Sequence, residues 1–302
     1  MKYTGYNYRY FLPHPSQWGS MELCRQRLNE LLDFCRKARI DAVQFFVNTL
    51  PGTYYMPAHH AREQAHWAAW MKAEVAPAVR RAGISYQLNF QMLLGAGSYG
   101  LEMRDEYDWD FLVNQYGQET LGCACPLSPS FRRGMGEMLR LWADTKPDVM
   151  WIDDDFRMHN HGLGDEELDF YCYCDRHLAE FARFAGHRYS RAELVRQVLR
   201  PGEPSSVRQQ WLDFLGRTMT ESAAWIRREV QGVSPRTRLA QMTSAPDVHS
   251  VEGRDWKAFL TALCGKYRPI TRPCSGCYTG TAVSMKSQTI TFRFMSQSIA
   301  TL

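Results

Sequence analysis

Short apolar segments alternate with amphipathic segments along most of this chain, and this rhythm limits the folds that it can adopt. The apolar segments include 41–48, 148–154 and 237–242, each of a length that suits one β-strand. The segments between them, such as 20–38 and 130–144, carry apolar residues at helical spacing. A strand followed by a helix and another strand predicts parallel pairing through right-handed crossovers. The sequence therefore predicts an α/β protein.

About six strand–helix units can be counted in the sequence. The predicted strands are 6–12, 41–48, 85–94, 148–154, 237–242 and 267–271, and the predicted helices are 20–38, 62–81, 130–144, 177–230 (broken near 201–204) and 256–264. A (β/α)8 TIM barrel is the predicted architecture, because neither dinucleotide-binding halves nor a composition break are present. A closed barrel needs eight units, so we predict a single TIM-barrel catalytic domain over residues 1–302 that lacks its last strands. The alternative is that two weak strands are hidden within 98–122 or 272–302.

Composition argues against several functional classes. The net charge is +4 and no five like charges run together, which disfavours a nucleic-acid partner. No apolar run approaches the roughly 20 residues that a membrane helix needs, and the N-terminus has no apolar core of a signal peptide. The nine cysteines are an odd number, spaced for a metal rather than for disulfides. We therefore expect a cytoplasmic protein without a membrane partner.

A group of cysteines and one histidine has the spacing of a metal site. Cys172, Cys174 and His177 lie within six residues at the start of a predicted helix. Cys125, just before a proline, can complete a Cys₃His set, the ligand set of structural zinc sites. Cys123 is an alternative fourth ligand, and the alternative to a metal is a set of half-buried thiols. The sequence predicts structural zinc as the cofactor.

Three consecutive aspartates, Asp153, Asp154 and Asp155, end a central apolar strand. Catalytic groups of barrel enzymes sit at this end of the strands, so we predict that these residues are catalytic. Mutual repulsion and burial raise the pKa of at least one of such carboxyls, which can then donate a proton near neutral pH. Arg157 can hold a neighbouring carboxylate ionised. The alternative is a salt-bridged loop.

Four other side chains are candidates for substrate binding: Arg157, His159, His161 and Trp109. The two histidines are interpreted as part of a polar loop that lines the cleft. With the aspartates they also allow a different hypothesis, a zinc-dependent hydrolase. Trp109 can stack on a sugar face, although an aromatic side chain in a polar loop often packs only locally.

Segments 123–133 and 150–184 resemble the family-42 β-galactosidases, which are zinc-containing barrel glycosidases of the retaining kind. The family's Cys-Pro-x-Ser-Pro-like turn is matched by Cys125-Pro126-Leu127-Ser128-Pro129, and its strand end Ile-Asp-Asn-Glu by Ile152-Asp153-Asp154-Asp155. Its zinc loop, Cys-Tyr-Cys-x-x-Cys, is matched by Cys172-Tyr173-Cys174-Asp175-Arg176-His177. The resemblance implies zinc at Cys125, Cys172, Cys174 and His177. It also implies that Asp155 is the proton donor and that Asp154 lies near the sugar 2-hydroxyl.

The chain departs from the family pattern at three points. The acid/base is an aspartate instead of a glutamate, and the loop between Asp155 and Cys172 is longer. No aspartate or glutamate follows Asp255, whereas a retaining glycosidase needs a second carboxylate about 5–5.5 Å from the first. The resemblance thus implies a β-galactosidase-like retaining hydrolase whose nucleophile lies outside this chain.

Other functions remain open at this point. They are the zinc-dependent hydrolase, a non-catalytic carbohydrate-binding barrel, and an inverting pair of Asp153 or Asp155 with a loop carboxylate such as Glu166. The expected partner is a carbohydrate, and the sequence leaves homo-oligomer formation open.

Overall fold

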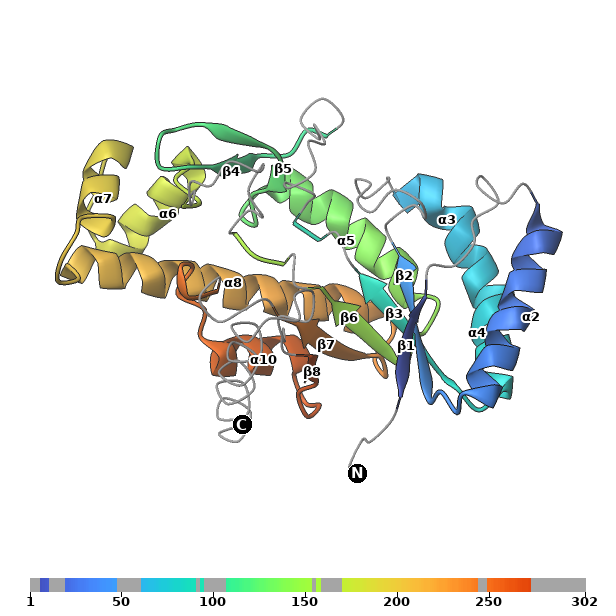
Figure 1. Cartoon of the computed structure of the whole chain (residues 1–302). Coiled ribbons are helices and arrows are strands. Elements are labelled where there is room, and N and C mark those ends of the chain that lie inside the picture. Colours follow the sequence, from blue (N-terminus) through green and yellow to red (C-terminus); the bar gives the residue numbers. More distant parts are fainter. Residues whose placement is uncertain are drawn as a thin grey trace.

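The computed structural model of the chain describes residues 6–10, 20–47, 61–90, 93–94, 107–153, 156–158, 170–243 and 249–272, with the backbone alone at 61–63 and 121–122. The main sheet has six parallel strands in the order β1 (Asn7–Tyr10), β2 (Ala42–Val47), β3 (Ser85–Phe90), β6 (Val149–Ile152), β7 (Arg238–Met242) and β8 (Thr271–Arg272). The sheet curls into a half-barrel with helices on its outer side (Figure 1). The prediction of an incomplete TIM barrel with six strand–helix units is confirmed.

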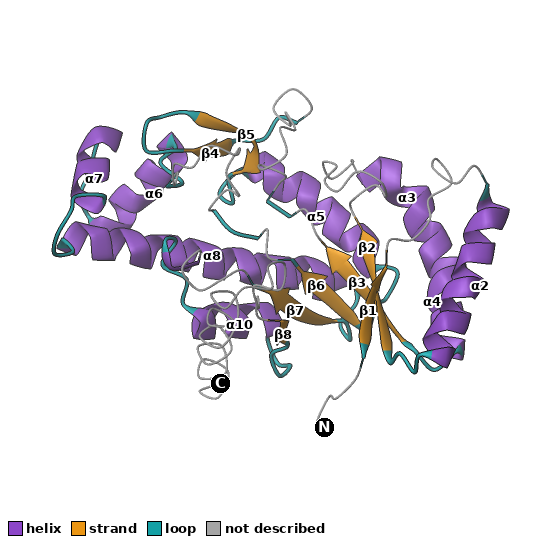
Figure 2. Ribbon diagram, in the orientation of Figure 1, coloured by secondary structure: helices purple, strands orange, loops and turns teal. Residues whose placement is uncertain are grey.

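The helices follow the strands as the sequence predicts, with differences at their ends (Figure 2). They are α2 (Met21–Lys37), α3 (Ala61–Trp70), the π-helical turn η1 (Met71–Val75), α4 (Ala76–Arg81), α5 (Pro129–Ala143), α6 (Asp175–Ala185), α7 (Arg191–Val198), α8 (Ser206–Val233) and α10 (Trp256–Cys264). Ser20 caps α2, as its Oγ accepts a hydrogen bond from the Leu23 amide at 3.2 Å. The single helix predicted over 62–81 contains the π turn just before Pro77, which has no N–H to donate.

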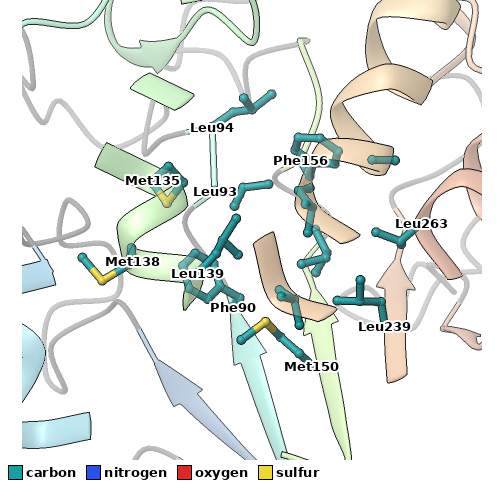
Figure 3. Packing of buried hydrophobic residues seen from close by; sticks show 14 of the residues in the cluster. Phe90, Leu93, Leu94, Met135, Met138, Leu139, Met150, Phe156, Leu239 and Leu263 are labelled. Atoms are coloured by element: carbon teal, nitrogen blue, oxygen red, sulfur yellow. The ribbon is translucent and has the colours of Figure 1, made fainter. Parts of the chain in front are cut away.

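The two faces of the sheet have different surroundings because side chains alternate along a strand. Figure 3 shows the helix-facing side, where Phe90, Met150 and Leu239 of the strands gather with Leu139 of α5 and Leu263 of α10. The concave side carries a separate small cluster, whose buried members are Val149, Trp151, Ala240 and Met242. The residue after β6 continues this alternation, so Asp153 belongs to the concave side.

Two further strands, β4 (Phe111–Val113) and β5 (Glu119–Ala124), form an antiparallel hairpin outside the main sheet. Weak strands were thus undetected around 98–122, but they do not add to the barrel. The Asn114 Oδ1 atom accepts hydrogen bonds from the amides of Tyr116 at 3.0 Å and Gln118 at 2.9 Å, which closes the turn. The polar turn and the three-residue length of β4 explain why periodicity missed the hairpin.

Some predicted boundaries were wrong. Strand β3 ends at Phe90, not at residue 94, and the strand predicted over 267–271 is displaced to β8. The Tyr267 amide donates to the Cys264 carbonyl in a turn at 3.1 Å, so this segment closes helix α10 before the strand begins. The long helix predicted over 177–230 is broken near 201–204 as expected, and also at Gly186, whose φ of 68° ends α6.

Helix α8 touches the turn before α10 through two glycines. A Cβ at Gly216 would overlap the carbonyl oxygen of Gly253, and a Cβ at Gly253 would overlap the carbonyl oxygen of Leu212. Gly253 also has a φ of +61°, which favours glycine. This close approach of two backbones seats the 249–254 turn against α8.

The Gly216 contact generates a prediction about stability. Gly216→Ala is expected to lower the free energy of unfolding by about 2 kcal/mol or more, because backbone has to move. Gly232→Ala, in the same helix with no atom within 4 Å of the added Cβ, is expected to raise it by about 0.5–1 kcal/mol. Urea unfolding of both variants checks this, and an unchanged midpoint for Gly216→Ala would contradict the close approach.

Candidate metal centre and active site

Cys125, Cys172, Cys174 and His177 converge at one buried point. Their ligand atoms all lie within 4.8 Å of one another. The Cys125 Sγ atom is 3.9 Å from Cys174 Sγ and 3.4 Å from His177 Nδ1, and Cys174 Sγ is 3.3 Å from the same nitrogen. None of the described cysteines forms a disulfide. The four predicted ligands are therefore brought together, with Cys125 and not Cys123 as the fourth.

These distances fit a tetrahedral metal site. Zn–S bonds of about 2.3 Å and Zn–N bonds of about 2.0–2.1 Å place the ligand atoms of a tetrahedron about 3.5–3.8 Å apart. The three separations that join Cys125, Cys174 and His177 are 3.3–3.9 Å and bracket this range, and Cys172 Sγ lies within 4.8 Å of the other ligand atoms. All four side chains are buried, and no fifth group of the described residues joins the cluster. The cluster can hold one metal ion with four protein ligands.

Local backbone structure aims the ligands at this point. Cys174 is the N-cap of α6, and its Sγ accepts a hydrogen bond from the His177 amide at 3.4 Å. Cys172 Sγ accepts one from the Val113 amide of the hairpin at 3.5 Å. The Tyr173 amide donates to the Val113 carbonyl at 2.8 Å, so the hairpin and the 172–177 segment are held together. Cys125 follows β5 directly, and thus the hairpin that periodicity missed delivers the fourth ligand.

The electrostatics of the cluster favour a cation at its centre. Burial raises the pKa of the Cys125 thiol, and the neighbouring Cys172 and Cys174 raise it further. Hydrogen bonding to Cys125 and Cys172 lowers the pKa of the Cys174 thiol far below its usual value. Burial lowers the pKa of His177, but Cys172 and Cys174 outweigh it and raise that pKa to about 10. The raised pKa of His177 indicates that the sulfur atoms favour a positive charge at this point, and a metal ion would take the place of the proton, because a ligating imidazole is neutral.

Of the three aspartates, the structure describes Asp153, which is buried and held from two strands. Its Oδ2 accepts hydrogen bonds from Arg9 Nη2 of β1 at 2.9 Å and from Asn89 Nδ2 of β3 at 2.7 Å. Arg9 also stacks over the ring of Phe46, 4.4 Å from its centre. A carboxylate in such an ion pair is suited to holding position and charge.

The other predicted site residues have different outcomes. Asp154, Asp155, His159 and His161 lie outside the described residues, so their roles stay predictions. Arg157 is described and buried. The partly buried Trp109 stacks on Tyr107, with ring centres 4.0 Å apart, and meets the Phe131 ring edge-on at 5.2 Å. Its role in sugar binding also stays a prediction.

A buried charged network, which the sequence did not point out, contacts the main chain of residues 156–158. His249 Nδ1 is 3.3 Å from Glu252 Oε1, and Glu252 forms an ion pair with Arg254. Burial and Arg254 lower the pKa of His249 to about 4, despite the hydrogen bond with Glu252. The pKa of Glu252 is lowered as well, since Arg254 and His249 outweigh the effect of burial. In the sequence these residues lie in a short polar stretch with no periodicity, so no signal separated them from a solvated loop.

Comparison with solved structures relates the half-barrel to glycoside hydrolases. The catalytic domain of a β-amylase from Paenibacillus polymyxa has a TM-score of 0.56 and 10% identity, over 92% of this chain and 78% of that chain. A β-galactosidase from Bacillus circulans sp. alkalophilus has a TM-score of 0.53 and 16% identity, over 86% of this chain and 38% of that chain. A β-galactosidase from Halorubrum lacusprofundi has a TM-score of 0.54 and 11% identity, over 93% of this chain and 42% of that chain.

These similarities concern the fold. No protein family model matches the chain, and no curated protein matches its sequence. The chain spans about two fifths of the length of the two β-galactosidases. Among the described residues, no helix is both long and apolar enough to span a membrane. The chain has a glycoside-hydrolase-like, incomplete TIM-barrel fold, and the distant resemblance to the family-42 β-galactosidases is supported.

The metal centre predicts a difference between two cysteines that lie two residues apart. Cys125→Ser is expected to remove most of the bound metal, because one of four ligands is lost. Cys123→Ser, at a buried position outside the cluster, is expected to keep the metal. Elemental mass spectrometry of both purified variants measures this. Equal metal content in the two variants would contradict the assignment of Cys125.

The buried His249 predicts a loss of stability in acid. The unfolded chain binds a proton at this residue below about pH 6.5, whereas the folded protein binds it only near pH 4. Between these pH values the unfolded state holds more protons, so stability falls as the pH falls, by about 3 kcal/mol in total. Urea unfolding at pH 7 and 4.5 measures this loss. His249→Asn should show a smaller loss than the wild type, whereas a variant of the exposed His187, His187→Asn, should show the full loss.

Proposed function

We propose that this chain carries the acid/base part of a β-galactosidase-like retaining glycoside hydrolase, with the nucleophile supplied from outside the chain. The observation that carries the proposal is the acidic segment that begins at Asp153, at the carboxyl end of the central strand β6 of a glycoside-hydrolase-like half-barrel. Barrel enzymes place their catalytic groups at this end of the strands. The carbohydrate substrate would lie on the concave side.

In this proposal the three aspartates have separate roles. Asp155 donates a proton to the glycosidic oxygen while the nucleophile attacks the anomeric carbon, so the leaving group departs as an alcohol and a glycosyl ester forms. The Asp155 carboxylate then takes a proton from a water molecule, which attacks the anomeric carbon and releases the nucleophile. Asp154 lies near the sugar 2-hydroxyl. Asp153, already paired with Arg9 and Asn89, holds the end of the strand.

We also propose that the metal is zinc with a structural role. Three cysteines and one histidine are ligands that zinc prefers, and four protein ligands leave no position for a reacting water. When bound, zinc joins Cys125 at the end of the hairpin to the start of α6. In this reading His159 and His161 bind substrate, not a catalytic metal.

A second candidate function is a carbohydrate-binding barrel without turnover. It is favoured by one observation, namely that no aspartate or glutamate follows Asp255 in the chain. Sugar binding without hydrolysis by the full-length protein would support it. Activity that chelation abolishes without unfolding the protein would instead support the zinc-dependent hydrolase.

The catalytic assignment is tested on the full-length protein with an aryl β-galactoside. Asp155→Asn is expected to lower kcat by about 10²–10⁴-fold, because the amide can neither donate nor accept the proton. Elemental mass spectrometry is expected to find about one zinc per chain in both proteins. Asp213→Asn, at an exposed position on α8, is the matched control with unchanged kcat. Full activity in Asp155→Asn would reject the assignment.

A further inference from the structure

The turn before α10 (residues 249–254) forms hydrogen bonds with the main chain of residues 156–158, which follow the three aspartates in the sequence. Glu252 Oε2 accepts a hydrogen bond from the Met158 amide at 2.8 Å. Arg254 Nη2 donates one to the Phe156 carbonyl at 2.7 Å. One acceptor and one donor from the same turn therefore hold two peptide groups of the 156–158 segment.

The two side chains that make these hydrogen bonds are charged and buried. The side chains of Arg254 and Glu252 are 0% and 1% exposed, and they form an ion pair with each other. The Arg254 guanidinium also lies over the ring of Phe259, 4.4 Å from its centre. Its Nε and Nη1 atoms have no hydrogen-bond partner among the described residues. Such burial of charge is costly, and apolar side chains of similar size often stabilise a fold equally well or better.

The Gly216–Gly253 contact explains how this turn comes close enough to α8 for Glu252 and Arg254 to be buried. Because neither residue has a Cβ, the turn packs directly on the backbone of α8. Glu252 and Arg254 flank Gly253 and thereby arrive beside Phe156 and Met158. The backbone contact and the buried charges belong to one arrangement that ends at the 156–158 segment.

We propose that Glu252 and Arg254 are positioning residues for the acid pair Asp154–Asp155. This inference rests on the proposed function. The pair stands in the chain between two anchored points. Asp153, on one side, is held by Arg9 and Asn89, and the 156–158 segment, on the other, is held by the turn.

Anchoring on both sides has a chemical reason. Transfer of a proton to a glycosidic oxygen requires hydrogen-bond reach, and a misplacement of about 1 Å lowers the rate by about 10²-fold. A strand end followed by a loop does not hold its side chains to that tolerance without further contacts. Charged hydrogen bonds to peptide groups are directional, whereas apolar packing in the same space is not. This difference explains why the turn carries a buried ion pair, although apolar side chains at the same positions would stabilise the fold.

The experiment replaces the pair by apolar side chains of similar size in the full-length protein. Glu252→Leu/Arg254→Met keeps the net charge, and its unfolding midpoint is expected to match or exceed that of the wild type. Its kcat for an aryl β-galactoside is expected to fall about 10²-fold with KM unchanged. Hydrogen exchange is expected to speed up at the Phe156 and Met158 amides and to stay unchanged at α5.

The matched control is Arg217→Met/Glu221→Leu, which removes an exposed ion pair of α8. It is expected to leave both kcat and the exchange of the two amides unchanged. A Glu252→Leu/Arg254→Met protein with wild-type kcat and wild-type amide protection overturns the proposal. A loss of kcat explained entirely by a lower unfolding midpoint overturns it too.

Two further outcomes also decide the question. If the double variant does not fold, Glu252→Gln takes its place, since it keeps an acceptor oxygen but weakens the bond to Met158. Wild-type kcat and protection in Glu252→Gln would then overturn the proposal. If the wild-type protein hydrolyses no glycoside, the proposed function fails, and Glu252 and Arg254 are no positioning residues for catalysis. In that case amide exchange shows separately whether the turn holds the 156–158 segment.

Discussion

Strand β6 is the element on which the rest of this structure depends. It is hydrogen-bonded on both sides, to β3 and to β7, and all four of its residues are buried. Met150 and Ile152 face the helices, while Val149 and Trp151 face the concave side. A strand held along both edges and both faces has one register, because a shift by one residue would exchange its two faces. The register of β6 therefore also fixes the position of Asp153, the next residue in the chain.

Charged side chains also hold Asp153 and the 156–158 segment, which follow the strand in the chain. Arg9 reaches Asp153 from β1, and Arg254 and Glu252 reach the 156–158 segment from the turn before α10. These contacts join segments that are 94 or more residues apart in the chain. Each is a directional interaction with at least one buried side chain, so each restrains geometry more than it adds stability.

The cysteine–histidine cluster attaches the β4–β5 hairpin to the rest of the structure. The β4–β5 hairpin lies outside the main sheet, and a two-stranded hairpin is only marginally stable by itself. The contacts of Val113 with the 172–173 segment, and the position of Cys125 in the cluster, attach this hairpin to the start of α6. Because a metal-binding site does not exist in the unfolded chain, the free energy of metal binding is also free energy of folding for this part of the molecule.

The sequence by itself determined the strand–helix alternation, the count of six parallel strands and three of the four ligands. All of these follow from periodicity or from spacing within a few residues, where the local backbone decides geometry. Only the tertiary structure decided that Cys125, not Cys123, is the fourth ligand, because the intervening hairpin sets which thiol faces the cluster. Only it showed that Asp153 is bound by Arg9 and that Glu252 and Arg254 contact the main chain of residues 156–158. Such contacts depend on how closely backbone segments that are far apart in the sequence approach each other, as at Gly216 and Gly253. Periodicity and local spacing contain no information about that approach.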